Sequence, residues 1–243
     1  MEQNQVLEQL ARRKSVRAYT GEPVTPEEKE AILKAAFQAP TAGNQQLYTI
    51  IDVTDQGLKD ALAVSCDNQP FIAKAALVLV FCADCKKWYD AYRSIGCDAR
   101  KPGPGDLLLA VADAAIAAQN AVTAAESLGI GSCYIGDILE RREEQRRLLN
   151  LPRYVLPAVM VVFGRGTEQQ LARPKPGRCP REQMVHQNGY REMDGAELRQ
   201  MLEWKRGERS YEEWLTAFWQ RKYESDFSRE MSRSVAEYLK EYC

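Results

Sequence analysis

The chain has 243 residues and a formal net charge of −1 at neutral pH. This length suffices for one well-buried domain or at most two small ones. The near-zero charge gives no bulk field that would draw the chain to nucleic acid or to an acidic membrane, so we expect neither as a partner. Seven cysteines without framework spacing and a polar N-terminus without signal-peptide features predict a cytoplasmic protein with reduced thiols.

The single histidine, His186, limits the chemistry that the side chains of this protein can perform. Zinc sites built on pairs of histidines are excluded, and the CxxC pair of Cys82 and Cys85 lacks a second pair to complete four ligands. A Ser-His-Asp triad would need His186, yet no GxSxG elbow accompanies it. We therefore expect no metal site and no catalytic side chain, and we interpret His186 as structural or surface-exposed.

Hydrophobic periodicity and capping signals predict alternating helices and strands in the first part of the chain. The expected elements are a helix over 4–14, a helix from the capping box at Thr25 to Ala39, a strand over 48–53, a helix from Asp55 to about Ser65, and a buried strand over 76–82. Residues 85–105 mix aromatic and basic side chains without a clear period and end in Lys-Pro-Gly-Pro-Gly. We expect this stretch to be an insertion or a lid.

Residues 106–128 predict one long helix with Asp106 as its N-cap. Asp106, Asp113 and Asn120 recur every seven residues and share one narrow stripe, whereas the rest of the circumference is apolar and rich in alanine. A helix with so little polar surface is buried. It is either a core helix only, or a helix shared between the core and a subunit interface, in which case a charge at Ala117 would disrupt the interface.

The remainder of the chain is expected to hold a short strand over 131–136, a charged surface helix over 140–150, a buried strand over 156–163, an extended basic segment over 171–181 and three C-terminal helices. No P-loop occurs, and Gly164-Arg165-Gly166 lacks the third glycine of a dinucleotide fingerprint.

Two basic segments, 13–17 and 173–181, could present guanidinium groups to a phosphate. Two loops of mostly small residues, 40–46 and 131–137, would let the backbone approach a flat ligand. The alternative interpretation of both basic segments is ordinary surface charge.

Three segments in this order resemble a known family: Arg13-Lys14-Ser15-Val16-Arg17, the Ala-Pro-Thr-Ala-Gly-Asn-Gln-Gln loop at 39–46, and Gly-Ile-Gly-Ser-Cys-Tyr-Ile-Gly at 129–136. Together with Asn68-Gln69, Leu151-Pro152, and Lys175 and Arg178 before Val185-His186, they look like the flavin-dependent nitroreductase family. The similarity extends over essentially the whole chain and is greatest to the branch of NADPH-type nitroreductases and flavin reductases.

The resemblance implies an α+β fold, a three-layer sandwich in which helices flank a mostly antiparallel sheet, built as an intertwined homodimer. A single domain would span 1–243, with 85–105 as a lid or insertion and 200–243 as a C-terminal extension that embraces the partner. FMN would lie at the subunit interface, two per dimer.

The resemblance also implies which residues bind FMN. Arg13, Lys14, Ser15 and Arg17 would hold the phosphate and ribityl side, and Lys175 and Arg178 would reach the same phosphate. The other implied contacts are Pro40, Thr41 and Ala42 along the ring, from either subunit, Asn44 and Gln46 in polar support, Gln69 at the pyrimidine edge, and Tyr134, Ile135 and Gly136 over the other face.

The implied activity is that of an NAD(P)H-dependent flavin oxidoreductase. NADPH or NADH would bind transiently and pass hydride through flavin N5, and a nitroaromatic, a quinone or free flavin would then accept the electrons in a ping-pong cycle. Two alternatives stay open, a non-catalytic flavin-binding sensor or storage protein on the same scaffold and a reductive dehalogenase-like member. Neither the physiological acceptor nor the choice between NADPH and NADH follows from the residues.

Overall fold

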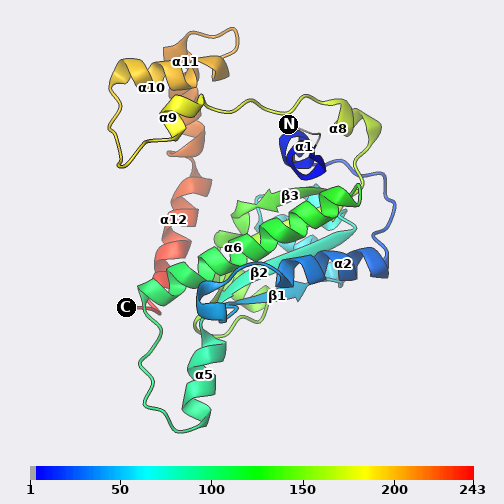
Figure 1. The fold of residues 1–243 in the computed structure, drawn as a ribbon, viewed down its shortest axis with the longest axis vertical. Coiled ribbons are helices and arrows are strands. Elements are labelled where there is room, and N and C mark those ends of the chain that lie inside the picture. The colour runs from blue at the N-terminus through cyan, green and yellow to red at the C-terminus, as the bar shows by residue number, and fades with distance from the viewer. Residues whose placement is uncertain (1–3) are drawn as a thin grey trace. The chain divides into compact units, whose positions relative to one another are not determined.

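The computed structural model describes residues 4–243; residues 1–3, part of the polar N-terminus considered above, lie outside the described residues. The chain folds into two compact units (Figure 1). The first runs through Pro174 and includes Glu230–Cys243, and the second is Lys175–Arg229. The expected role of 200–243 in embracing a partner concerns the assembled protein and stays a prediction.

The first unit is built on a four-stranded antiparallel sheet in the order β1-β2-β4-β3. The strands are β1 (Tyr48–Asp52), β2 (Leu77–Asp84), β3 (Gly131–Ile135) and β4 (Val155–Gly164). All eight residues of β2 are buried, as its unbroken apolar run predicts for a central strand. The register of β2 against β4 shifts at Ala158, which follows Pro157; this bulge accommodates the missing proline N–H.

Helices cover both faces of the sheet, because alternate side chains of β2 point to opposite sides. Leu79 and Phe81 pack in the core beneath α2 (Pro26–Phe37) and α6 (Pro104–Ser127). Val80 and Cys82 pack in the second core, beneath α3 (Gln56–Ser65), α4 (Pro70–Ala73) and α7 (Arg142–Leu148). The predicted α+β sandwich of three layers is thus confirmed, and Figure 1 shows α2 and α6 side by side over one face.

Helix α6 begins at Pro104, two residues earlier than predicted, and Asp106 is not its N-cap. The N-cap is Gly103, and the carboxylate of Asp106 accepts the Gly103 N–H at 2.8 Å while pairing with Arg100. The helix ends as expected, since Gly129 has a φ of +73° and the N–H of Ile130 donates to the carbonyl of Ala125 at 2.9 Å.

The polar stripe of α6 connects the helix to its neighbours. The carboxylate of Asp113, only 3% exposed, accepts the N–H of Ala42 at 2.9 Å and of Leu47 at 3.1 Å. One heptad later, the side-chain amide of Asn120 donates to the carbonyl of Ala35 at 3.2 Å. These bonds anchor the connection between α2 and β1 to the middle of α6.

The 24 residues of α6 are long and apolar enough to cross a membrane, and its packing against the sheet accounts for that composition. Ala117 is fully buried within the chain, so a charge there would disrupt the core of one subunit and would not test an interface as expected. The apolar residues that α6 exposes are Leu108, Leu109 and Ile116.

The segment 85–105 contains a helix, α5 (Lys86–Ser94), where no regular structure was expected. Its first N–H groups, those of Lys86 and Lys87, donate to the carboxylate of Asp84 at 3.0 and 3.2 Å. Asp84 is the last residue of β2, so one residue both ends the strand and caps the helix that follows, and the strand signal concealed the cap.

The second unit is helical and contains α9 (Arg181–Met184), α10 (Gly195–Leu202) and α11 (Tyr211–Lys222). The capping boxes predicted at Asp194 and Ser210 are both present. In this unit Nδ1 of His186 accepts the N–H of Arg191 at 3.0 Å, so the single histidine helps to hold a turn. The remaining elements are α1 (Gln5–Arg12), α8 (Glu168–Ala172), α12 (Asp226–Leu239), and three short 3-10 helices, η1 (Ala42–Asn44), η2 (Gly136–Leu139) and η3 (Glu203–Lys205).

Gly131 marks the point where the segment after α1 reaches the sheet. Ser15 forms a parallel bridge with Ser132 on β3, and the N–H of Val16 donates to the carbonyl of Ser132 at 3.0 Å. A Cβ added at Gly131 would lie 2.4 Å from Cγ2 of Val16, so only glycine permits this close approach.

We predict that Gly131→Ala lowers the free energy of unfolding by about 1–3 kcal/mol, because the added methyl group overpacks the contact with Val16. The control is Gly105→Ala in the first turn of α6, where an added Cβ meets nothing within 4 Å. Urea denaturation of both variants makes the comparison. Equal stability of the two variants would contradict the proposed close packing.

Candidate functional site

Three predicted phosphate ligands converge on strand β3. Burial raises the pKa of the Cys133 thiol on β3. The charge of Arg17, hydrogen bonds with Ser15 and Arg17, and the charge of Arg13 act in the opposite direction and lower this pKa. The guanidinium of Arg17 also lies over the ring of Phe71, 5.8 Å from its centre. Nη1 of Arg13 is buried without a hydrogen-bond partner in the described chain. An unpaired buried guanidinium N–H is a donor suited to an anion.

Lys14 points elsewhere than its neighbours. Its ammonium donates to the carbonyl oxygens of Leu171 and Arg173, and it therefore fastens the segment 13–17 to the end of α8. Gln170 reinforces this junction, since its side chain accepts the N–H of Arg17 and donates to the carbonyl of Ser15, both at 3.4 Å. Sequence reasoning missed Gln170, because a buried glutamine inside a polar run carries no local signal.

Gln69 is held at the far end of β3. Its side-chain amide donates to the carbonyl of Cys66 and to Oδ2 of Asp137, both at 2.9 Å. Asp137 directly follows Gly136, the first residue after β3, so Gln69 and Gly136 meet at the same end of the strand. Asp137 was not among the predicted site residues.

The side chains of Tyr134 and Ile135 are engaged within the chain. The hydroxyl of Tyr134 bonds with the side-chain carbonyl of Gln119 on α6 at 3.2 Å, and burial raises the pKa of this hydroxyl to about 12. The side chain of Ile135 is 2% exposed and packs in the core beneath α3. The predicted residues of 13–17, Gln69 and 134–136 therefore form one continuous track along β3.

The loop 40–46 is anchored to α5 and α6. Ala42 is held by Asp113, and the hydroxyl of Thr41 accepts the N–H of Gln46 at 3.1 Å. Asn44 and Gln46 adopt left-handed backbone angles, with φ of 54° and 51°. Pro40, by contrast, is exposed and leads into the loop.

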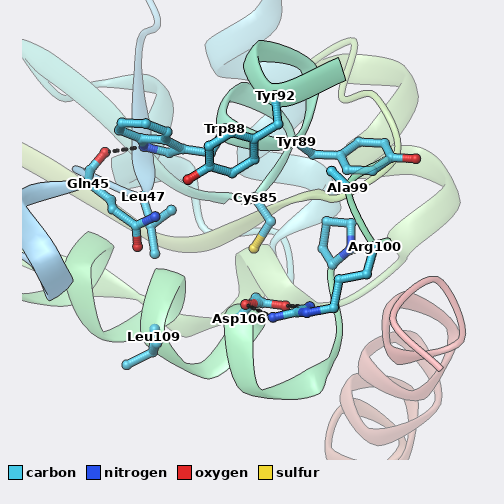
Figure 2. A pocket seen from close by; sticks show the side chains of 11 residues that line it. Gln45, Leu47, Cys85, Trp88, Tyr89, Tyr92, Ala99, Arg100, Asp106 and Leu109 are labelled. Carbon is cyan, nitrogen blue, oxygen red and sulfur yellow. Dashed lines mark hydrogen bonds and ion pairs between the residues drawn. The ribbon is translucent and has the colours of Figure 1, made fainter. Parts of the chain in front are cut away.

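A cavity of about 310 Å³ opens beside this loop, between α5 and the start of α6 (Figure 2). The indole N–H of Trp88 donates to the carbonyl of Gln45 at 2.6 Å and closes the cavity on the loop side. The ion pair of Arg100 with Asp106 borders it, and the rest of its lining is mainly apolar or aromatic: Leu47, Cys85, Tyr89, Tyr92, Pro102 and Leu109. Its size and lining suit a flat aromatic molecule.

The loop 40–46 and the basic segment 13–17 lie beside different parts of α6. Asp113, in the middle of the helix, holds the loop, whereas Glu126, near its C-terminal end, pairs with Arg12 at 4.0 Å, directly before the basic segment. These two helical positions are 13 residues apart, which corresponds to about 20 Å of helix. The loop and the basic segment therefore do not meet along α6, although Tyr134 of β3 reaches Gln119 between them.

Lys175 and Arg178 belong to the second unit. There Nη1 of Arg178 donates to the carbonyl oxygens of Pro176 and Gly177, at 2.9 and 3.1 Å. Their predicted approach to the phosphate held by 13–17 stays a prediction.

The cysteines do not form a metal site among residues 4–243. No group of three or more His, Cys, Asp or Glu in this range could hold a metal ion, and all seven cysteines are free thiols. Cys82 is fully buried, but β2 continues for two more buried residues to Asp84, so the expectation that Cys82 ends the strand was wrong. Burial raises the pKa of both Cys82 and Cys85 to about 12.

A family model described as the nitroreductase family matches residues 10–165. The chain belongs to the nitroreductase family. Among characterised relatives, an oxygen-insensitive NADPH nitroreductase of Salmonella typhimurium is 39% identical over 188 residues, 77% of this chain and 75% of the relative. An FMN reductase [NAD(P)H] of Bacillus subtilis is 32% identical over 97% of this chain and 91% of its own length.

Solved structures agree with this membership. The NADPH:FMN oxidoreductase of Vibrio harveyi, solved in complex with NAD+, matches with a TM-score of 0.81 and 26% identity over 97% of this nitroreductase and 98% of that chain. The family and branch suggested by the sequence are thereby confirmed.

We predict that Asp113→Ala lowers the free energy of unfolding by about 2–4 kcal/mol, because it leaves the N–H groups of Ala42 and Leu47 without their buried partner. Asn120→Ala, one heptad later on α6, removes a single hydrogen bond and should cost about 1 kcal/mol. Urea denaturation gives these energies, and amide hydrogen exchange at Ala42 and Leu47 should accelerate only in Asp113→Ala. Unchanged exchange there would refute the anchoring role.

Proposed function

We propose that this nitroreductase is an FMN-dependent oxidoreductase that passes electrons from NADPH or NADH to small electron-poor acceptors. The observation that carries the proposal is the convergence of Arg13, Ser15 and Arg17 on β3, with a buried guanidinium N–H left unpaired. The names of the relatives support it, since they include FMN reductases and an NADPH-flavin oxidoreductase.

The donors along β3 match the parts of FMN in order. Two guanidinium groups and a hydroxyl, from Arg13, Arg17 and Ser15, suit a phosphate, because charge-assisted hydrogen bonds to phosphate are strong. Lys14 supports this group by fixing the segment to α8. The backbone of 134–136 would lie along the ring, and Gln69 would bond the pyrimidine edge.

Bound FMN supplies the electron-transfer chemistry, accepting hydride from the nicotinamide and delivering two electrons to the acceptor. The chain contributes position and charge. Arg13 and Arg17 would provide positive charge to the flavin, and the backbone N–H of Gly136 would provide a donor for its ring. No described side chain is needed as a general acid or base, which suits a protein with one histidine.

Completion of the site requires a second subunit, because the loop 40–46 lies about 20 Å along α6 from the basic segment of its own chain. In a homodimer the partner's loop would bring Pro40, Thr41, Ala42, Asn44 and Gln46 to the ring, and Lys175 and Arg178 would complete the phosphate site. The apolar side chains that one chain exposes support this proposal: Val6, Leu7 and Leu10 on α1, and Leu108, Leu109 and Ile116 on α6.

The acceptor would enter beside the aromatic cavity of Figure 2, whose dimensions suit a nitroaromatic, a quinone or free flavin. Residues 85–105 would then act as the lid, and 200–243 as the extension that embraces the partner. The free thiols support a reducing, cytoplasmic location. An assay with NADPH or NADH and a quinone separates the enzyme from a non-catalytic flavin-binding protein.

We predict that the purified protein carries one non-covalent FMN per chain and that Arg17→Ala weakens FMN binding at least tenfold. The lost charge-assisted hydrogen bond is worth about 1.5–3 kcal/mol. Arg12→Ala is the control, since its exposed side chain only pairs with Glu126 at 4.0 Å. Flavin fluorescence gives the dissociation constants and melting of the apo forms gives stability. Failure of the wild type to bind FMN would sink the proposal.

We predict an obligate dimer that Ile116→Glu dissociates, because a carboxylate would be buried in an apolar interface. The control is Lys34→Glu, an exposed position on α2. Analytical ultracentrifugation at nanomolar protein should find the wild type and the control dimeric, and Ile116→Glu monomeric with most of its flavin lost. A flavin-loaded wild-type monomer is the result that contradicts the shared site.

A further inference from the structure

A chain of polar side chains at the end of β3 extends beyond the flavin contacts proposed above. It runs from Gln69 through Asp137 to Glu140, the residue after η2. Glu140 is only 4% exposed, its Oε1 is buried without a partner in the described chain, and its backbone N–H donates to the carbonyl of Asp137 at 3.0 Å.

Burial, followed by the charge of Asp137 and the hydrogen bond with it, raises the pKa of Glu140 to about 7. Of the other groups nearby, Asp67 after α3 raises it further and Arg141 lowers it. The thiol of Cys66 stays neutral, because burial raises its pKa to about 12. Glu230 of α12 bonds the backbone N–H of Arg141 at 3.1 Å.

Asp137 determines the orientation of Gln69, because its Oδ2 accepts a hydrogen bond from the Gln69 side-chain amide at 2.9 Å. A primary amide has two N–H donors and one carbonyl acceptor. Both donors of Gln69 are used, one by the carbonyl of Cys66 and one by Asp137. A flipped amide would place its carbonyl oxygen against the carboxylate of Asp137, which is repulsive. Gln69 can therefore offer a ligand only its carbonyl oxygen.

We propose that Asp137, with the buried carboxyl group of Glu140 beside it, is a positioning residue that fixes Gln69 as an acceptor for a ring N–H. In a flavin that group is the imide N3–H of the pyrimidine ring, so the inference rests on the proposed function. Without Asp137 the side-chain amide of Gln69 could rotate and present either its oxygen or its NH2 group, so it would no longer favour a ligand group that donates a hydrogen bond. The site therefore distinguishes an imide that carries a hydrogen from one that is alkylated.

The experiment compares the dissociation constants of FMN and N3-methyl-FMN by flavin fluorescence. In the wild type we expect FMN to bind at least tenfold more tightly, because the methyl group removes the donor and meets the oxygen of Gln69. Asp137→Asn should reduce this ratio to less than threefold, since asparagine offers either a donor or an acceptor. Glu27→Gln, an exposed change on α2, is the control and should keep the ratio.

The variant Glu140→Gln tests whether ionisation of the Glu140 carboxyl group matters. It keeps a donor toward Asp137 and should keep the ratio at every pH, whereas in the wild type the ratio should fall between pH 6 and pH 8 as Glu140 ionises. FMN and N3-methyl-FMN carry the same phosphate, so the effect of phosphate ionisation on binding cancels when the two are compared at equal pH. The role of Glu140 is overturned if the ratio of the two dissociation constants stays constant between pH 6 and pH 8 in the wild type, just as in Glu140→Gln.

Equal binding of the two flavins by the wild type, or an unchanged ratio in Asp137→Asn, would overturn the positioning role of Asp137. Should Asp137→Asn fail to fold, Gln69→Met replaces it, because it removes the acceptor oxygen and must likewise abolish the ratio. If the wild type binds neither flavin, the proposed function itself is wrong. That outcome differs from tight but unselective binding, which refutes only this inference.

Discussion

The structure depends on a buried carboxylate in the middle of its central helix. An apolar helix such as α6 could pack on a sheet in several rotations, but a buried charge without partners costs several kcal/mol. Asp113 avoids that cost only where it meets the N–H groups of Ala42 and Leu47. This requirement selects one rotation of α6 and ties the loop 40–46 to the core, although the loop itself contributes little apolar area.

The opposite part of the site depends on a sheet edge. β3 lies at the edge of the sheet, where unpaired backbone groups need a partner. Ser15 and Val16 supply it through their contact with Ser132, and the same contact brings Arg13 and Arg17 to the strand. Protection of the edge and assembly of a phosphate site are thus one feature, and Gly131 permits both.

Hydrophobic period and capping boxes predicted the elements well, because these signals are local: α2 begins after Thr25, and β2 is an unbroken apolar run. The failures have two causes. Asp84 caps α5 although it is also the last residue of β2, so the strand signal and the cap signal overlap. Gln170 acquires its role from contacts more than 150 residues away in sequence. For the site, the family resemblance named Gln69, but nothing in the chain before folding joins it to Asp137.

The separation of the two half-sites has a consequence for how this protein can change over evolution. α6 sets the spacing between Asp113, which holds the loop, and Glu126, which lies beside the basic segment. Inserting one residue between them would rotate everything that follows by about 100° and advance it by about 1.5 Å. Asn120 would turn away from Ala35, and Tyr134 would lose Gln119. Surface loops can lengthen freely, whereas this helix should tolerate no insertion or deletion between Asp113 and Glu126.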